Sequence, residues 1–432
     1  MARSERVGRG PIGSERHRVA TSRAPARPPR TARIVRPMTA TDPRTGWLVS
    51  AQSGATTLSP ARDEVIAFDL EGRPASWFVA GRTFKRSLAS DVYGRQSVAG
   101  VRRRWRVAED EAAELFERAI AVAAAARSAL AAGDALPPAG VDRDALAARL
   151  EVASAWTPER LRDERDRFAA AYAPVSILPP DQYGAVVLQA TFGCSWNRCT
   201  FCTFYQDRPF EVRAPDAFDR HLSAVQALLG RAAASRRSVF LADGNALVLS
   251  NARLRPLIGA AREAFPDRPL AGFVDVFSGE RKPVQDWLEL RHLGLERVAV
   301  GLETGHDPLL AYLNKPGSAD EAVEFVTTLK AAGLKVAIIL MLGAGGRRFA
   351  RGHERDSATL LERLPLGADD IVYLSPFVRH AGSAYAERAV DDGLEDLSEA
   401  ERAEQDAALR AAARRGVSAA RVARYHIDEF VY

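Results

Sequence analysis

Cysteine is scarce in this sequence: the 432 residues include only three, and all three fall within nine consecutive positions. Cys194, Cys199 and Cys202 are separated by four and by two residues. An odd number of cysteines this close together excludes the disulfide framework of a small secreted domain and favours a reducing compartment, the cytoplasm. Cysteines that serve only as small buried side chains would be scattered along the chain. The cluster therefore predicts metal ligands.

Long apolar runs are also missing. No stretch approaches the roughly 18 consecutive apolar residues that a membrane-spanning helix needs, so we expect no membrane span. The composition, 47% hydrophobic and 27% charged, is ordinary for a globular protein, and 432 residues are enough for more than one domain.

The body of the chain lacks an excess of basic residues. The whole chain carries a formal charge of +5, but residues 1–37 hold ten arginines and two glutamates, a net +8, which leaves −3 for the rest. Binding to nucleic acid depends on clustered basic residues at phosphates, so we do not expect it of the body. Residues 1–46 are rich in Arg and Pro and are expected to form a disordered leader. Met38 is an alternative start of translation.

Residues 47–175 predict an accessory α+β domain. Short β-branched or aromatic runs separated by turn residues predict strands at 47–50, 65–70 and 76–80. An Ala-rich stretch closed by Gly133 predicts a helix over 109–132, and Thr157 followed by Pro158 predicts the start of a helix that runs to about residue 172. No metal, phosphate or acid/base motif is found in this region.

From residue 184 onward, apolar strand-like runs alternate with amphipathic helical stretches. The predicted strands are 185–190, 238–242, 270–276, 297–301, 335–342 and 370–375, and the predicted helices are 214–229, 251–265, 282–293, 319–332 and 356–364. Continuous apolar strands, each followed by a helix, predict a parallel sheet. The fold class is therefore α/β, with a partial (β/α)6 TIM-type barrel over 176–385 and a C-terminal helical extension over 386–432. In such folds the functional residues lie on the loops that follow the strands.

The cysteine loop directly follows the first of these strands, and it suits either zinc or an iron–sulfur cluster. A structural zinc needs a closed tetrahedron of ligands, and the nearest downstream histidine that could supply the fourth is His221. A cubane takes one thiolate per iron, so three cysteines leave one iron open to a further ligand.

Three other segments follow predicted strands. They are LADGNA at 241–246, GLETG at 301–305 with LNKPG at 313–317, and the glycine-rich turn at 343–346. Taken singly, such glycines are ordinary turn residues and Glu303 is an ordinary ion-pair partner. In combination with the cysteine loop, in which aromatic Phe201 precedes the last cysteine, their order resembles the radical S-adenosylmethionine (radical SAM) superfamily. The loop of that family is most often CxxxCxxC, whereas this one has one more residue after Cys194.

The resemblance implies a 4Fe–4S cluster on the three cysteines and S-adenosylmethionine (SAM) bound at its open iron. It places Phe201 beside the cofactor, Asp243 and Gly244 at the methionine amino group, and Glu303 at the ribose or the amino end. The turn that begins with Leu342 and Gly343 would lie against the adenine. It also implies an electron donor of the flavodoxin or ferredoxin type, and a 5′-deoxyadenosyl radical that takes a hydrogen atom from a substrate.

The substrate, a small molecule or a peptide, is not identified by the sequence, and neither are catalytic residues beyond the cofactor ligands. A fourth cysteine is absent, which excludes an all-cysteine auxiliary cluster, and a DxHxxG segment is absent, which disfavours a cobalamin domain. Candidates for lining a substrate pocket are Arg379, His380, Tyr385, Tyr425, His426, Phe430, Val431 and Tyr432. Two other functions remain open: an iron–sulfur redox or oxygen sensor, and a binding protein with a zinc loop.

Overall fold

The computed structural model describes residues 48–98, 101–134, 137, 140–416, 420–427 and 430–432. These residues belong to one compact unit, Ala40–Tyr432. The leader expected over residues 1–46 lies outside the described residues. Within the described part of the chain, no helix is both long and apolar enough to cross a membrane.

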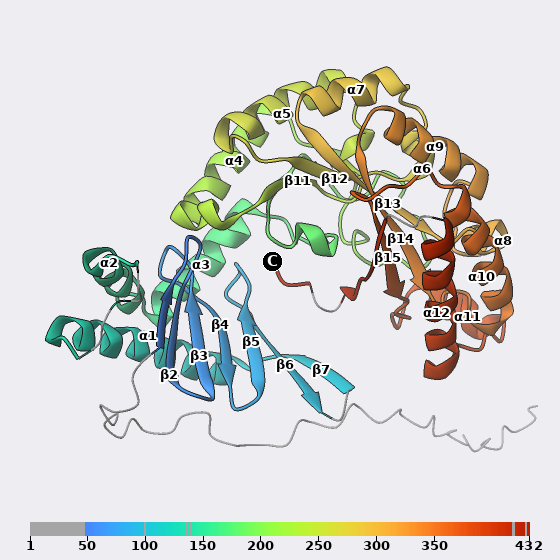
Figure 1. Cartoon of the computed structure of the whole chain (residues 1–432). Coiled ribbons are helices and arrows are strands. Elements are labelled where there is room, and N and C mark those ends of the chain that lie inside the picture. The colour runs from blue at the N-terminus through green and yellow to red at the C-terminus, as the bar shows by residue number, and fades with distance from the viewer. Residues whose placement is uncertain (1–47, 99–100, 135–136, 138–139, 417–419, 428–429) are drawn as a thin grey trace, which may run out of the picture. The chain divides into compact units, whose positions relative to one another are not determined.

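The first part of the chain forms an antiparallel sheet of seven strands, each paired with the next along the chain (Figure 1). The strands are β1 (Leu48–Ala51), β2 (Thr56–Ala61), β3 (Glu64–Phe68), β4 (Pro74–Val79), β5 (Arg82–Arg86), β6 (Val92–Val98) and β7 (Val101–Arg106). The three strands predicted from the sequence correspond to β1, β3 and β4. The other four were not predicted, because polar and basic residues interrupt their apolar pattern.

One face of this sheet is apolar and packs against a helix. Leu58, Ile66, Trp77 and Phe84 alternate with less buried neighbours along their strands and are at most 1% exposed, as expected for a sheet with one buried face. Trp77 donates a hydrogen bond from Nε1 to the Leu115 carbonyl oxygen at 3.1 Å. This contact fixes the sheet against the helix that contains Leu115.

Three helices follow the sheet: α1 (Glu109–Ala132), α2 (Arg143–Ser154) and α3 (Pro158–Ala171). The helices predicted over 109–132 and from residue 157 are confirmed. Gly133 ends α1 in the left-handed conformation, φ 84°, which glycine adopts without steric cost. Asp142 and Thr157 cap α2 and α3 by accepting hydrogen bonds from Ala145 N and Arg160 N.

The second part of the chain is a parallel sheet of seven strands in the order β16-β15-β14-β13-β12-β11-β8. The strands are β8 (Ala185–Gln189), β11 (Ser238–Ala242), β12 (Leu270–Phe273), β13 (Leu295–Glu303), β14 (Lys335–Leu342), β15 (Ile371–Pro376) and β16 (Arg421–Arg424). A two-stranded ribbon, β9 (Thr191–Phe192) with β10 (Glu211–Val212), follows β8. The predicted α/β class and partial barrel are confirmed.

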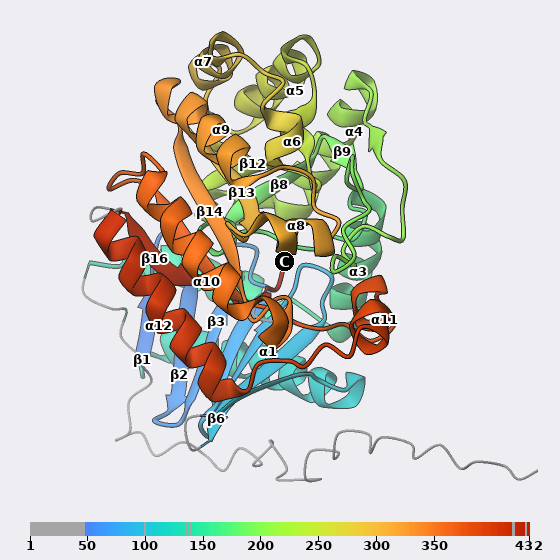
Figure 2. The ribbon, with the colours of Figure 1, turned by 90° about the vertical axis from the view of Figure 1, so that its right-hand side faces the viewer.

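Helices cover the outside of the parallel sheet (Figure 1). The helices that contribute to the core against the sheet are α4 (Pro215–Leu229), α5 (Asn251–Ala264), α6 (Val276–Gly279), α7 (Val284–His292), α9 (Ala319–Ala331), α10 (Gly346–Arg363) and α12 (Glu399–Gly416). Two further helices, α8 (Asp307–Tyr312) and α11 (Ala384–Asp391), pack together in a separate buried cluster. Figure 2 shows α10 and α12 side by side, packed along their lengths.

Two predictions about this region were wrong. Helix α10 begins at Gly346 and not near residue 356, because the glycine turn passes directly into the helix. The region after residue 386 is not purely helical, since β16 adds a seventh strand that pairs in parallel with β15. Arg421 and Arg424 are exposed at the edge of the sheet, so β16 lacks the apolar run by which the other strands were found.

Side chains on the barrel strands alternate between two environments. Val300, Ile338 and Leu374 belong to the large core beneath the helices. Their neighbours Ile339 and Tyr373 belong to a separate cluster on the inner face of the sheet. This alternation leaves the inner face available for a site at the carboxyl ends of the strands.

Arg73 joins the antiparallel sheet to the barrel. It is 1% exposed and forms ion pairs with Asp69 at 2.7 Å and with Glu164 at 2.6 Å. It also donates to the carbonyl oxygens of Leu228 and Leu229 at the end of α4. A buried guanidinium is tolerated only when its donors are satisfied, and here the partners come from three different segments.

Candidate functional site

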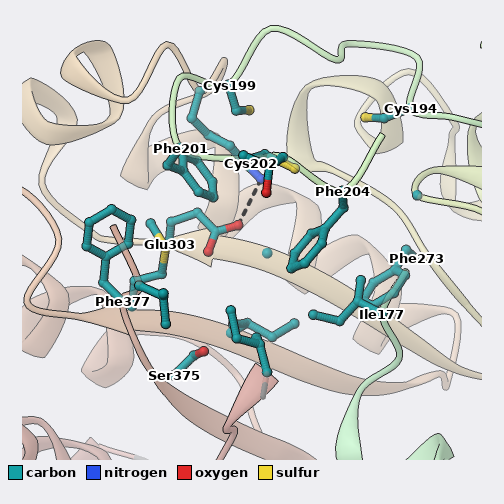
Figure 3. Close-up of a pocket in the computed structure, with 18 of the residues that line it drawn as sticks. Ile177, Cys194, Cys199, Phe201, Cys202, Phe204, Phe273, Glu303, Ser375 and Phe377 are labelled. Atoms are coloured by element: carbon teal, nitrogen blue, oxygen red, sulfur yellow. Dashed lines mark hydrogen bonds and ion pairs between the residues drawn. The ribbon is translucent and has the colours of Figure 1, made fainter. Parts of the chain in front are cut away.

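The three cysteines lie on the loop that follows β8 and β9, and all of them line one cavity (Figure 3). Each is partly exposed and none forms a disulfide. Figure 3 shows Cys199 and Cys202 on one side and Cys194 at a distance from them. Among the described residues, no group of three or more His, Cys, Asp or Glu side chains is placed to hold a metal ion. The sulfurs therefore border a shared space and do not surround a single point.

Burial raises the pKa of the Cys199 thiol to about 12 and that of Cys202 to about 11. Without a cation these thiols are protonated at neutral pH. Thiolates are the form that binds metal, so binding of metal here must displace protons.

The segment Leu313–Lys315, which follows α8, holds the cysteine loop in place. Thr200 N donates to the Leu313 carbonyl oxygen at 2.9 Å. Trp196 Nε1 donates to the Asn314 carbonyl oxygen at 2.9 Å, and Asn314 Nδ2 donates to the Arg198 carbonyl oxygen at 2.7 Å. The loop has little regular secondary structure of its own, so these bonds help to fix its backbone. They also explain why LNKPG and the cysteine motif occur in the same site.

Asp243 fixes both ends of the cysteine loop. Its carboxylate accepts hydrogen bonds from Gly193 N and from Arg208 Nε, each at 3.3 Å, and from Gln189 Nε2 at 3.5 Å. Burial raises the pKa of Asp243, and Arg208 opposes this effect. The residue is 2% exposed, and the neighbouring Gly244, not Asp243, lines the cavity.

A second polar cluster joins the cysteine loop to β12. Asn245 Nδ2 donates to Ser195 Oγ at 2.7 Å, to Ser278 Oγ at 3.3 Å and to the Asp275 carboxylate. Asn245 Oδ1 accepts from Asp275 N at 3.2 Å. Asp275 caps α6 by accepting from Ser278 N at 2.7 Å, and it lines the cavity. Its position could not be found from the sequence, because an aspartate before a short helix is an ordinary N-cap.

Glu303 and Lys315 form an ion pair on the cavity wall. Lys315 Nζ lies 3.1 Å from Glu303 Oε1, and Figure 3 marks this contact with a dashed line. Burial is the largest single effect and lowers the pKa of Lys315, but the charge interactions with Glu303, Cys199 and Asp275 and the hydrogen bond to Glu303 together outweigh it, and the pKa is raised. Lys315 belongs to the LNKPG motif, and the sequence alone does not indicate its role.

The backbone at Glu303 departs from regular strand geometry. Glu303 has φ 64°, and the register of β13 against β14 shifts between Gly301 and Glu303. A methyl group on Gly301 would collide with Glu303 Oε1, and Lys315 Nζ lies 3.3 Å from the same position. Glycine at 301 therefore provides the space that the ion pair occupies.

In the turn after β14, two backbone N–H groups donate hydrogen bonds to side chains that lie outside the barrel strands. Gly343 N donates to Gln405 Oε1 at 2.7 Å, and Gly345 N donates to Tyr385 Oη at 3.0 Å. Leu342 and Gly343 do not line the cavity described above, whereas Met341 does. Tyr385 is fully buried and serves to fix this turn.

Of the predicted site residues, the structure places Cys194, Cys199, Cys202, Phe201, Gly244 and Glu303 around one cavity. His380 and Tyr425, two of the pocket candidates near the C-terminus, also line it. Tyr432 does not: its hydroxyl accepts from Val187 N at 2.9 Å, at the free edge of β8. Apolar lining residues such as Ile177 and Ile427 were missed, because nothing in an isolated apolar side chain distinguishes a pocket from a core.

Comparison with known proteins identifies the barrel. Residues 188–347 match the family model of the radical SAM superfamily. This part of the chain is a radical SAM domain. No curated protein sequence matches the chain.

Solved structures that resemble the chain have low identity and limited overlap. Coproporphyrinogen III oxidase (HemN) from Escherichia coli is 15% identical with a TM-score of 0.40, covering 53% of this chain and 52% of its own. Methylornithine synthase (PylB) is 16% identical with a TM-score of 0.39, covering 56% of this chain and 72% of its own. The cobalamin-dependent enzyme OxsB is 14% identical with a TM-score of 0.36, covering 49% of this chain and 30% of its own. The chain thus spans less than a third of OxsB and about half of the oxidase.

Proposed function

We propose that this radical SAM enzyme binds a 4Fe–4S cluster through Cys194, Cys199 and Cys202 and cleaves SAM reductively to act on a substrate held in the same cavity. The observation that carries the proposal is that one cavity at the carboxyl ends of the barrel strands is lined by all three free cysteines and by the Glu303–Lys315 pair. Three thiolates and an adjacent charged pair are suited to a cluster and a polar cofactor lying side by side.

The donor set fits a cluster better than a single zinc ion. Zinc requires four ligands about 2.0 to 2.3 Å from one point, and among the described residues no such group is present. His221 is not available, because its Nδ1 lies 2.8 Å from the Ala171 carbonyl oxygen and its Nε2 accepts from Gln189 N at 3.0 Å. In a cubane each cysteine binds its own iron, so the sulfurs stand further apart and one iron stays open.

When bound, a cluster held by Cys194, Cys199 and Cys202 would supply the electron for reductive cleavage of SAM, and SAM would supply the radical chemistry that acts on the substrate. We propose a flavodoxin or ferredoxin as the electron donor. A reducing compartment such as the cytoplasm suits three free thiols.

The chain's own residues orient the reactants and limit the access of water. In this proposal Glu303 accepts hydrogen bonds from the polar groups of SAM, while Lys315 holds its carboxylate in position. Asp243 and Asn245 act as positioning residues, because their hydrogen bonds end on Gly193, Ser195 and Arg208, which lie in or beside the cysteine loop. Gly244 gives close access to the backbone, since a side chain there would meet the ring of Tyr205.

Metal analysis after anaerobic purification and reconstitution tests the cluster assignment. We expect a brown protein with about four irons per chain, and loss of iron and visible absorbance when any of the three cysteines is changed to serine. Ser223→Ala, on the exposed side of α4, is the matched control and should keep its iron. Stoichiometric zinc without visible absorbance would contradict the proposal and favour the zinc-loop alternative.

A further inference from the structure

We propose that the substrate is a predominantly apolar, uncharged molecule that makes a hydrogen bond with the hydroxyl of Ser375. This inference rests on the proposed function, because it assigns the part of the cavity that faces the cysteine loop to the substrate. It is carried by three observations: the apolar character of that part, the absence of a free lysine or arginine among its described residues, and the position of Ser375.

The wall opposite the cysteines is apolar (Figure 3). Phe273 on β12 and Ile339 and Met341 on β14 contribute to it from the barrel strands. Ile177, which precedes β8, and Ile427, which follows β16, contribute from outside the six strand–helix units. Segments at both ends of the barrel domain therefore close the cavity with apolar side chains, which favours a ligand that buries apolar surface.

Beneath this wall the inner face of the sheet is filled. Ala299, Ala337, Ile371 and Tyr373 form a buried apolar cluster with Ile339 and Tyr425. The cavity therefore ends at Ile339 and Tyr425 and does not continue as a wet channel through the barrel. A charged group pushed against this floor would lose its hydration without gaining a partner, which is costly.

The charged groups around the cavity are already engaged. Lys315 is the only Lys or Arg among the described residues that line it, and it is paired with Glu303. The carboxylate of Asp275 accepts hydrogen bonds from Asn245 and Ser278. No described lysine or arginine of the lining is thus free to bind a carboxylate or phosphate of a substrate. His380 also lines the cavity, but an imidazole is positively charged only when it is protonated, so anionic substrates are disfavoured where imidazoles are neutral.

Ser375 is a polar residue that the barrel strands contribute to this wall. It lies on β15 opposite Met341, is 6% exposed and lines the cavity. Within the described part of the chain, no residue bonds to its hydroxyl, and the oxygen is not among the fully buried atoms that lack a partner. It is therefore accessible from the cavity. A hydroxyl can both donate and accept, so it suits an alcohol, a carbonyl or an amide.

Equilibrium binding to the full-length protein tests this inference without requiring SAM cleavage. The neutral fluorescent probe N-phenyl-1-naphthylamine is titrated at pH 8, where imidazoles are ordinarily neutral. We expect saturable binding at one site, weakened at least tenfold by Ile177→Asp, which places a charge in the wall. Val390→Asp adds the same charge at a position that is 73% exposed and should have no effect. Equal probe affinity in wild type and Ile177→Asp would overturn the assignment of the cavity.

Competition for the probe tests the chemistry of the ligand. We expect 1-naphthol to displace the probe better than naphthalene, and 1-naphthoate to displace it poorly. Ser375→Ala should reduce the preference for naphthol over naphthalene by about threefold to tenfold, the contribution of one hydrogen bond. Naphthoate competing as well as naphthol, or a preference unchanged in Ser375→Ala, would overturn the proposal. Because the readout is binding of the probe, this result is independent of whether a cluster is present.

Discussion

Lys315 Nζ and Glu303 Oε1 lie 3.1 Å apart. They lie beside Gly301, where a Cβ atom would meet both of them. The two side chains are 12% and 10% exposed, so solvent and salt screen their attraction less than they would at the surface. The pair contributes no net charge to the cavity wall. It also connects the end of β13 with the segment that fixes the cysteine loop.

The first prediction concerns Glu303 as a ligand of SAM. Glu303→Gln removes a charged acceptor and should weaken SAM binding to the reconstituted protein by about tenfold to a hundredfold, which corresponds to roughly 1.5 to 3 kcal/mol. Isothermal titration calorimetry under anaerobic conditions measures the change. Glu387→Gln, at an exposed position on α11, is the control. Unchanged affinity in Glu303→Gln would leave this residue a purely structural role.

The second prediction concerns Gly301. Gly301→Ala places a methyl group against Glu303 Oε1, so the carboxylate must move and SAM binding should weaken in the same direction as in Glu303→Gln. Gly259→Ala is the matched control, because no atom lies within 4 Å of the added methyl group. That substitution, inside α5, should be neutral or stabilise the protein by up to about 1 kcal/mol. Wild-type affinity in Gly301→Ala would show that the position of the carboxylate is not critical.

The third prediction concerns pH and His221. Burial lowers the pKa of His221 to about 4, from an ordinary value near 6.5. The unfolded chain therefore takes up a proton near pH 6.5 and the folded chain only near pH 4. The contribution of neutral His221 to the free energy of unfolding is therefore fully present above about pH 7. It is lost as the pH falls from 6.5 toward 4.

Between pH 7 and pH 5 this effect should cost about 2 kcal/mol of unfolding free energy. His221→Gln should make the dependence shallower by that amount, as measured by urea denaturation at both pH values. Burial likewise lowers the pKa of His353 to about 4, so part of the dependence will remain. His292→Gln, at an exposed position, should not change the slope. An equal slope in wild type and His221→Gln would contradict the assignment.

Much of the fold could be predicted from local sequence patterns. Helix α1 was predicted with its observed ends, 109–132, because an Ala-rich run with acidic residues in its first turn and a closing glycine carries strong local signals. The six apolar barrel strands were found for a similar reason. Strand β16 was missed, since Arg421 and Arg424 at a sheet edge form a strand only through pairing with β15.

The site was harder to predict from the sequence than the fold, because its geometry depends on contacts between segments that are distant along the chain. The sequence placed Asp243 and Gly343 after the correct strands, but alternation along the chain does not tell which side chain enters a cavity. In the structure the Asp243 carboxylate meets Gly193 and Arg208, and Gly343 N meets Gln405, 62 residues away. The role of Lys315 likewise depends on a fold that returns it to Glu303.

The central claim is that this chain performs SAM-dependent radical chemistry at the cysteine loop. The most direct measurement is the formation of 5′-deoxyadenosine by the reconstituted protein with SAM and dithionite under anaerobic conditions. We predict formation by the wild-type protein and none by Cys199→Ser. Failure of an iron-loaded wild-type protein to form 5′-deoxyadenosine would contradict the account and favour a cluster that senses oxygen or redox state.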